Sequence, residues 1–189
     1  LLMFGSHQDV TSRKEREQAI VNLAHQLEVQ ATTDSLTGLL NRRGWEDSIV
    51  LEEARERRYG GKSCVIFLDL DGLKKINDTQ GHEAGDNLIR RAAQCIQAEM
   101  RDVDRIARIG GDEFAILVTE CAEGSVLAVL KRLKERFADE GILFSWGTAA
   151  CDPSTGIVCA VREADRRMYE MKGKRRTANN DKIISPLLI

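Results

Sequence analysis

The feature that most constrains the fold is a short hairpin pattern near the middle of the chain. Two apolar runs, Ile106–Ile109 and Phe114–Val118, flank the pair Gly110-Gly111, and apolar runs joined by a glycine turn predict a tight β-hairpin. Asp112 and Glu113 follow the glycines directly. Glycines let a bulky anion approach the backbone, and adjacent carboxylates are suitable ligands for Mg²⁺ that carries phosphates. Taken alone, however, the pattern is better explained as an ordinary hairpin with polar turn residues.

Composition restricts the class of protein. The chain has 189 residues, of which 42% are hydrophobic and 31% charged, and its net charge is −2, which fits one ordinary domain plus an appendage. Without a basic excess, binding to a nucleic acid polymer is not expected. The five cysteines are scattered without a CxxC pair, so neither a disulfide framework nor a thiolate metal site is predicted. We expect a reducing, cytoplasmic setting without direct membrane contact, because no secretory signal or membrane-length apolar run is visible.

The remaining pattern predicts helices and strands in a definite order. Helices are predicted over residues 12–31, 45–58, 83–100, 123–139 and 158–172, and strands over residues 64–70, 106–109, 114–118 and 142–150. A capping box at Ser12–Glu15 begins the first helix. A short helical stretch after residue 72 leads into a loop over residues 77–82, and the tail 179–189 is predicted as a short edge strand.

From residue 60 onward, the order of strand, helix, hairpin, helix, strand and helix follows the β-α-β-β-α-β plan. We predict an α/β (α+β) fold in which a single mixed, mostly antiparallel sheet is surrounded by helices and preceded by an N-terminal helix. The predicted organisation is a tag or disordered lead over residues 1–11, a helix over 12–33, one domain over 34–178 and a tail over 179–189.

The N-terminal helix carries Ile20, Leu23 and Leu27 at alternating three- and four-residue steps. This is less than two heptads, so the pattern fits two structures equally well. One is the stub of a coiled coil, and the other is a single amphipathic helix packed on its own domain.

Carboxylates are predicted to meet at one rim of the sheet. The strand that ends at Asp69 and the hairpin at Gly110–Glu113 are natural neighbours in a β-α-β-β-α-β sheet. A strand that ends in an aspartate beside a hairpin with Asp-Glu is an arrangement that holds Mg²⁺ for phosphoryl transfer.

Several segments, in the right order, resemble the GGDEF-domain diguanylate cyclase family. They are DSLTGLLNRR at residues 34–43, FLDLDGLKKIND at 67–78, GHEAGD at 81–86, GGDEF at 110–114, SWGTA at 145–149, and Ala164, Asp165, Tyr169 and Lys172 near the end. The resemblance covers roughly residues 34–176. It implies a fold of the palm or nucleotidyl-cyclase type and the condensation of two GTP molecules into cyclic di-GMP, with release of two pyrophosphates.

The resemblance also implies a metal site and catalytic residues. Asp69 and Asp112 would bind Mg²⁺ (or Mn²⁺) through their side chains, and Leu70 through its backbone carbonyl. Glu113 would either help to deprotonate the attacking hydroxyl or act as a further metal ligand, and the sequence does not separate these roles. Two cations that bridge phosphate oxygens stabilise both the attacking and the leaving oxygen.

The same resemblance implies a substrate site. Asn77 and Asp86 occupy the positions that read guanine, since an amide and a carboxylate complement the edge of that base. His82, between them, either contacts the substrate or braces the loop. The other implied substrate residues, which approach the nucleotide or its phosphates, are Leu73, Lys74, Gly110, Gly111, Lys172 and Arg176. Lys74 is equally explained as a solvated surface lysine.

Two departures from the family pattern lie in this substrate site. Leu73 stands where phenylalanine is usual, and Arg175-Arg176-Thr177 replaces the usual Gly-Arg-Asn.

A second constellation is an RxxD pattern at Arg101 and Asp104, whose aspartate lies six residues before Gly110. A solvated charge run is the usual explanation of such a pattern, but the offset is that of the family's product-inhibition site. There the pair would bind cyclic di-GMP as an allosteric inhibitor.

The family further implies a homodimer, because one domain holds one GTP, and an upstream sensory module whose signalling helix ends at residue 33. The alternative function is a catalytically inactive domain that acts as a receptor for cyclic di-GMP or GTP. The presence of Asp69, Asp112 and Glu113 argues against that alternative.

Overall fold

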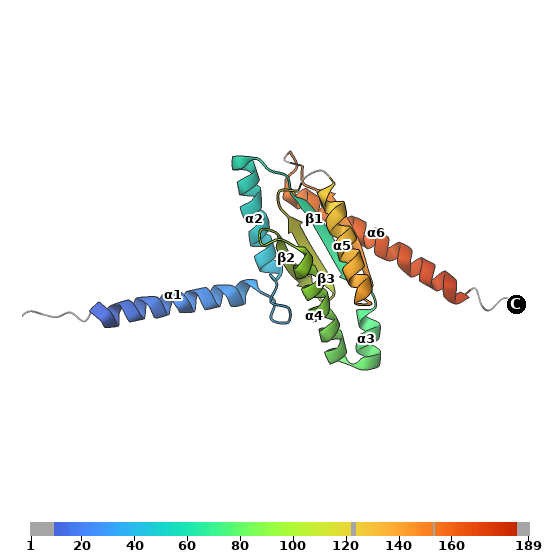
Figure 1. The fold of residues 1–189 in the computed structure, drawn as a ribbon, viewed down its shortest axis with the longest axis horizontal. Helices are drawn as coiled ribbons and strands as arrows, with labels where there is room; N and C mark the ends of the chain where they lie inside the picture. The colour runs from blue at the N-terminus through green and yellow to red at the C-terminus, as the bar shows by residue number, and fades with distance from the viewer. Residues whose placement is uncertain (1–9, 122–123, 153, 185–189) are drawn as a thin grey trace, which may run out of the picture.

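The computed structural model describes residues 10–121, 124–152 and 154–184, and it describes only the backbone of residues 10–12 and 176–184. Figure 1 shows one sheet with helices on both of its faces, and α1 projects away from this body. The elements in chain order are α1 (Val10–Thr32), α2 (Arg42–Tyr59), β1 (Cys64–Leu70), α3 (Leu73–Gln80), α4 (His82–Glu99), β2 (Arg105–Gly110), β3 (Glu113–Val118), α5 (Ser125–Asp139), β4 (Phe144–Ala150) and α6 (Ile157–Ile184).

The four strands lie in the order β2-β3-β1-β4, and each neighbouring pair is antiparallel. The predicted α/β fold, with its β-α-β-β-α-β order and N-terminal helix, is confirmed. The sheet is antiparallel throughout its four strands. A parallel contact is made outside them by the isolated bridge between Leu40 and Ala107.

Strand β1 is central, and every one of its residues is buried because helices cover both faces of the sheet. Its side chains alternate between two core layers, as the period of a strand requires. Ile66, Leu68 and Leu70 belong to the layer under α4 and α5, whereas Val65 and Phe67 belong to the layer under α2 and α6. A continuous apolar run in the sequence therefore marks a strand buried on both sides.

Aromatic side chains stabilise both core layers. Phe137 of α5 packs edge-on against Phe144 with ring centroids 4.6 Å apart, and Trp45 of α2 packs edge-on against Phe67 at 6.3 Å. On the α6 side, the helix approaches β4 so closely that a Cβ on Gly147 would lie 2.0 Å from the carbonyl oxygen of Ala164. Glycine at that position thus sets the distance between β4 and α6.

Several element boundaries differ from the prediction, among them the start of α2 at Arg42 instead of residue 45 and that of β4 at Phe144 instead of residue 142. Helix α1 begins at Val10, before the capping box at Ser12, and residues 1–9 of the predicted lead lie outside the described residues. Residues 77–80 are not a loop, since they complete α3 and Gly81 caps it by donating to the carbonyl of Asn77.

The predicted edge strand at the tail is also wrong, because α6 continues through residues 179–184, while residues 185–189 lie outside the described residues. No proline interrupts the sequence of α6 before Pro186, so the helix can run on.

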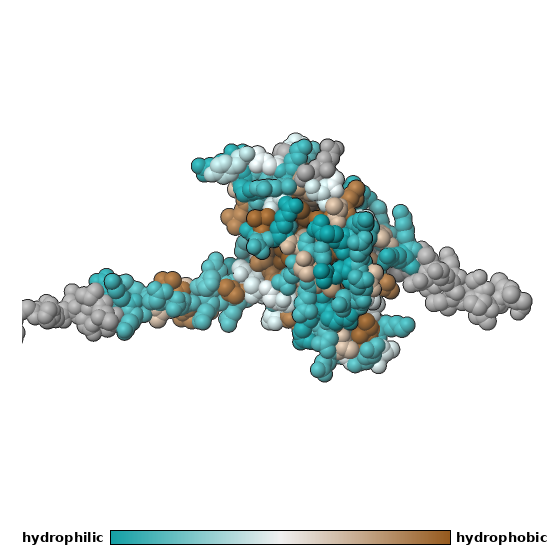
Figure 2. Space-filling view, viewed as in Figure 1, coloured by the Kyte–Doolittle hydropathy of each residue, from teal (hydrophilic) through white to brown (hydrophobic). Residues whose placement is uncertain are grey.

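Helix α1 leaves its large apolar side chains exposed instead of packing them on its own domain. Ile20, Leu23 and Leu27 are 67%, 56% and 56% exposed, and Figure 2 shows apolar side chains on the open surface of this helix. The prediction of an amphipathic helix packed on its own domain is therefore wrong. The coiled-coil stub stays a prediction.

The cysteines are all free, and only Cys159, on α6, is exposed. Burial raises the pKa of the thiols of Cys64, Cys95 and Cys151, the last to about 12. Among the described residues, no helix is both long enough and apolar enough to cross a membrane.

Candidate functional site

The end of β1 and the β2–β3 hairpin meet at one rim of the sheet, as predicted. Asp69 is the register partner of Glu113, and the backbone N–H of Leu70 donates to the carbonyl of Asp112 at 3.0 Å. The two turn residues are Gly111 and Asp112, one position later than predicted, because Gly110 pairs with Glu113. An irregularity between Arg108 and Gly110 absorbs one residue and shifts the register.

The outer side of this turn is bare. A Cβ on Gly111 would meet no atom within 4 Å, and neither Gly110 nor Gly111 has a positive φ. Glycine is therefore not needed here for an unusual backbone conformation. Its absence of a side chain leaves open space beside Asp112, where another molecule can approach the backbone.

A cation from α6 lies between two carboxylates at the rim. The Nζ of Lys172 contacts Oδ2 of Asp69 at 2.5 Å and Oδ2 of Asp112 at 4.0 Å. The Asp69 side chain is 3% exposed, compared with 20% for Lys172. Burial raises the pKa of Asp69, the hydrogen bond from Lys172 lowers it, and the charge of Asp112 raises it again, so that the pKa lies above its ordinary value.

The donors at this rim fit a divalent cation. Oδ1 of Asp69 is buried and has no hydrogen-bond partner, and a buried acceptor without a partner is costly unless a ligand satisfies it. The described residues contain no group of three or more His, Cys, Asp or Glu side chains that could hold a metal ion. Mg²⁺ commonly takes only one or two carboxylates and completes its shell with substrate phosphates and water. Asp69 and Asp112 are sufficient for that kind of site.

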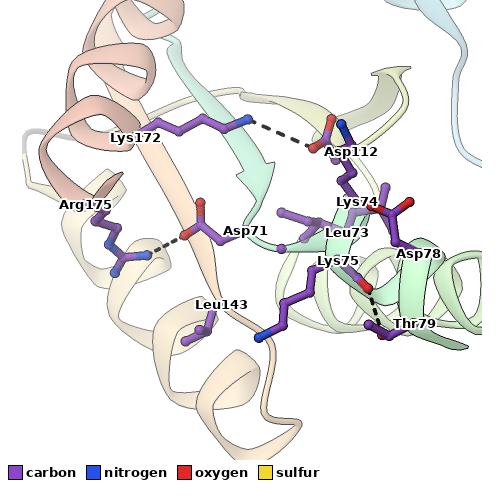
Figure 3. A pocket seen from close by; sticks show the side chains of 12 residues that line it. Asp71, Leu73, Lys74, Lys75, Asp78, Thr79, Asp112, Leu143, Lys172 and Arg175 are labelled. Carbon is purple, nitrogen blue, oxygen red and sulfur yellow. Dashed lines mark hydrogen bonds and ion pairs between the residues drawn. The ribbon is translucent and has the colours of Figure 1, made fainter. Parts of the chain in front are cut away.

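A cavity of about 800 Å³ opens beside these carboxylates (Figure 3). Its lining is Leu70, Asp71, Gly72, Leu73, Lys74, Lys75, Asp78, Thr79, Asp112, Leu143, Lys172 and Arg175. Lysine and arginine side chains enter it from two separate elements, α3 and α6. Such a concentration of cations beside two carboxylates suits a polyphosphate that carries a metal ion.

Of the residues predicted to act in the site, five line this cavity: Leu70, Leu73, Lys74, Asp112 and Lys172. Arg176 lies on α6, but its side chain is outside the described part of the structure.

Arg175 was not predicted as a site residue. Its Nη1 donates to Asp71 Oδ2 at 2.8 Å and to the carbonyl of Phe144 at 2.5 Å, and the hydroxyl of Ser145 donates to the same carboxylate at 3.1 Å. Asp71 and Arg175 are 104 residues apart in sequence, so no local pattern marks them as partners. The available signal was spacing, since Arg175 lies one helical turn after Lys172.

The residues predicted to read guanine lie on the packed pair α3 and α4, outside the lining of the large cavity. Oδ1 of Asn77 is buried without a hydrogen-bond partner. A Cβ on Gly85 would lie 1.9 Å from this oxygen, so glycine lets the two helices approach. Asp86 is half-buried and His82, the first residue of α4, is exposed.

Glu113 faces a different space from Asp112. It lines a second cavity of about 470 Å³. The other lining residues are Arg42, Trp45, Glu46, Ile49, Val50, Phe67, Ile109, Val158, Val161, Arg162 and Asp165, from α2, β1, β2 and α6. Of the two predicted catalytic carboxylates, Asp112 therefore lines the first cavity and Glu113 the second.

The segment after α1 braces the hairpin turn. Arg108 donates through Nη1 to Asp34 at 3.1 Å and through Nη2 to the carbonyl of Gly111 at 2.9 Å. Burial of Asp34 opposes ionisation, but hydrogen bonds from Thr37 and the Arg108 guanidinium outweigh it and hold the pKa of this carboxyl below its ordinary value. The sequence segment at residues 34–43 is thus connected to the hairpin turn through one arginine.

The RxxD residues precede β2 and so lie at the opposite end of that strand from the turn. The strand itself spans about 17 Å at a rise of about 3.4 Å per residue. Arg101 is exposed, whereas Asp104 is buried. The carboxylate of Asp104 accepts the backbone N–H of Arg101 at 3.0 Å and that of Thr119 at 3.1 Å. Asp104 therefore has a structural role in this state, and Arg101 is available to a ligand.

Comparisons with known proteins agree with this arrangement. The family described as "Diguanylate cyclase, GGDEF domain" matches residues 31–178. A probable diguanylate cyclase of Escherichia coli K12, DgcC, is 35% identical over 136 residues, which are 71% of this chain and 35% of the relative. The diguanylate cyclase DgcS of Shewanella oneidensis is 31% identical over 156 residues, which are 80% of this chain and 53% of the relative. The chain spans about a third to a half of these relatives.

A similar solved structure is the coiled coil and GGDEF domain of DgcB from Caulobacter crescentus in complex with c-di-GMP. It superposes with a TM-score of 0.77 at 28% identity, over 88% of this chain and 96% of that chain.

Proposed function

Since the chain belongs to the GGDEF diguanylate cyclase family, we propose that it condenses two GTP molecules into cyclic di-GMP and two pyrophosphates. The observation that carries the proposal is the rim where Asp69, Asp112 and Lys172 meet beside a cation-lined cavity. Relatives named as diguanylate cyclases support it.

The reaction requires two identical displacements. In each, the 3′-hydroxyl of one GTP attacks the α-phosphorus of the other, a P–O bond forms, and the bond to pyrophosphate breaks while the hydroxyl proton passes to a base. Mg²⁺ or Mn²⁺, held by Asp69, Asp112 and the Leu70 carbonyl, would supply charge neutralisation at the phosphates. Lys74, Lys172 and Arg176 would bind the triphosphate, with Leu73 and the bare backbone at Gly110 and Gly111 beside it.

Glu113 is proposed as the base or as a further metal ligand. It lies across from Asp69 in the sheet but lines the second cavity, so it can act on a group that approaches from outside the first cavity. Asn77 and Asp86 are proposed to read guanine, with His82 near them.

One domain would hold one GTP, so the proposed enzyme is a homodimer in which two rims face each other. Helix α1, with its exposed apolar residues, would pair with its copy and connect to an upstream sensory module. The solved relative that includes a coiled coil supports this arrangement. Cyclic di-GMP is also proposed as an inhibitor at Arg101 and Asp104, and that relative's complex with c-di-GMP supports a ligand of this kind.

The test is product analysis from GTP and Mg²⁺ at high protein concentration. We expect cyclic di-GMP from the wild type and no turnover from Glu113→Gln, because the carboxylate is lost while the fold is kept. Glu135→Gln, at an exposed position on α5, is the matched control and should keep full activity. An active Glu113→Gln would remove this residue from the mechanism, and an inactive wild type that binds cyclic di-GMP would favour the receptor function.

A further inference from the structure

Lys172 lies within reach of both the carboxylates of the rim and the adjoining cavity. It reaches from α6 across the mouth of the large cavity toward Asp112 (Figure 3), and it makes its shorter contact with Asp69. Its side chain also lines the cavity. The ammonium therefore stands at the boundary between the carboxylates and the space for a substrate.

We propose that Lys172 is a displaceable counter-cation that occupies the place of the divalent cation between Asp69 and Asp112 until the metal ion enters. Once displaced, its ammonium is free to bind the triphosphate in the adjoining cavity. This inference rests on the proposed function, since it assumes that the rim takes a metal ion and that the cavity takes a nucleotide.

The charges at the rim require a cation in either state. Two carboxylates close together, one of them almost fully buried, repel each other and lose hydration unless a positive charge lies between them. Lys172 supplies that charge at 2.5 Å from Asp69 and 4.0 Å from Asp112. The fold therefore supplies a positive charge beside both carboxylates before any metal ion arrives.

The lysine does not satisfy the site completely. Oδ1 of Asp69 stays buried without a hydrogen-bond partner, and the single ammonium charge is shared between two carboxylates. A divalent cation with several coordination positions neutralises both carboxylates. The ammonium of Lys172 therefore stabilises the two carboxylates, but exchange of the ammonium for a divalent cation stabilises them further.

A lysine side chain is also well suited to move away from the two carboxylates. Its ammonium is a compact charge on a flexible four-carbon stem, and the side chain of Lys172 is 20% exposed. Arg175 is a contrast on the same helix, because its guanidinium is held by both Asp71 and the carbonyl of Phe144. Of these two cations, Lys172 is the one that can turn from the rim into the cavity without breaking contacts to the backbone.

The consequence is competition between Lys172 and the metal ion in the nucleotide-free protein. A ligand that must displace a bound group shows reduced apparent affinity. Removing the ammonium should therefore raise the affinity for the metal ion by about fivefold, the equivalent of an ion pair worth about 1 kcal/mol. The same change should weaken the binding of a nucleotide, because the variant has no ammonium at position 172 to bind the phosphates.

The experiment measures Mn²⁺ binding by electron paramagnetic resonance in the nucleotide-free full chain. We expect Lys172→Met to bind Mn²⁺ about fivefold more tightly than the wild type. Lys174→Met, an equal charge change at an exposed position on the same helix, should match the wild type. Asp69→Asn should abolish the binding, which shows that the signal comes from the rim. Circular dichroism verifies that each variant is folded, and Lys172→Gln is the second variant if Lys172→Met is not.

Equal or weaker Mn²⁺ binding by both Lys172 variants would overturn the proposal, as would an equal gain in Lys174→Met. Absence of Mn²⁺ binding in the wild type and in the Lys172 variants would also overturn it. The result of the Mn²⁺ experiment can be distinguished from the result of the cyclase assay. A wild type that makes cyclic di-GMP without this competition refutes the counter-cation alone, and competition without product refutes the cyclase alone.

Discussion

At the scale of single residues, Asp34 forms an ion pair with Arg108 that holds the hairpin turn in place. Its carboxylate accepts from Thr37 and from Arg108, and Arg108 also holds the carbonyl of Gly111. Both partners are largely shielded from water, with 20% and 15% of their side chains exposed. Such a pair is less screened by solvent than most ion pairs of the surface.

This pair predicts a pH dependence of stability. A carboxyl whose pKa is lowered on folding stabilises the folded state above its unfolded pKa, near 3.9, and loses that contribution as the pH falls through its folded pKa. Asp34→Asn should therefore lower the free energy of unfolding by about 1 kcal/mol at neutral pH, with a smaller deficit at pH values below the folded pKa. Urea titrations of both proteins at neutral and acidic pH measure the difference. A deficit that is independent of pH would contradict this assignment.

Arg101 and Asp104 predict opposite results within one motif. Arg101→Ala should relieve product inhibition without lowering the initial rate. The side chain of Arg101 is exposed, so its removal should leave the fold unchanged. Asp104→Ala should destabilise the protein, because the backbone N–H of Thr119 and that of Arg101 lose their acceptor. Initial rates with and without added cyclic di-GMP test the first variant, and thermal unfolding tests the second. Arg90→Ala, on the exposed surface of α4, is the control, and unchanged inhibition in Arg101→Ala would refute the inhibitory site.

At the scale of elements, the position of α6 depends on one glycine. A Cβ on Gly147 would lie 2.0 Å from the carbonyl oxygen of Ala164 and 2.3 Å from the backbone nitrogen of Met168. These are backbone atoms and cannot rotate away, so α6 as a whole would have to move. Because α6 carries Lys172, the geometry of the rim depends on this contact between a strand and a helix.

Gly147→Ala should therefore destabilise the protein by about 1–3 kcal/mol or more, as overpacking does, and should weaken nucleotide binding through the displaced helix. Denaturant unfolding and titration with a non-hydrolysable GTP analogue measure the two effects. Gly173→Ala, where a Cβ would meet no atom within 4 Å, should keep or slightly raise the stability. A fully stable Gly147→Ala would show that the sheet and α6 adjust at no cost.

The sequence predicted those elements that follow from local periodicity. The buried strand 64–70 and the adjacency of Asp69 to the hairpin were predictable, because apolar runs and element order determine them. The turn was displaced by one residue, since the irregularity between Arg108 and Gly110 has no sequence signature of its own. Polar residues at 77–80 suggested a loop, but backbone hydrogen bonds continue α3 through them.

Contacts between distant segments were beyond the reach of such patterns. The pairing of Arg175 with Asp71 and that of Lys172 with Asp69 join segments about a hundred residues apart. The separation of Asp112 and Glu113 into two cavities is likewise set by which face of the sheet each side chain takes, together with the helices packed there. The residue types of the site were predictable, and their division between the two cavities was not.

At the scale of the whole molecule, α1 presents apolar side chains that the described part of the chain leaves largely uncovered. Its apolar residues Ile20, Leu23 and Leu27 are more than half exposed, and the helix ends at the segment that braces the hairpin turn through Asp34 and Arg108. A second copy that covers this stripe would fix the direction of α1 relative to the rim.

Glutamates on this stripe should separate folding from association. The double variant Leu23→Glu/Leu27→Glu should keep its unfolding free energy to within about 0.5 kcal/mol, because both sites are exposed, while its self-association weakens. Sedimentation velocity measures the association, and specific activity should fall most at low protein concentration. Gln26→Glu, exposed on the same helix, should behave as the wild type. Undiminished association in the double variant would exclude α1 from the dimer interface.

The distribution of thiols gives the molecule a ready spectroscopic handle. Four cysteines are buried, and burial raises the pKa of three of them, so a maleimide dye should label the exposed Cys159 first. That residue lies on α6, thirteen positions before Lys172. A fluorophore on Cys159 would report movement of α6, the helix that carries Lys172, without any engineered cysteine.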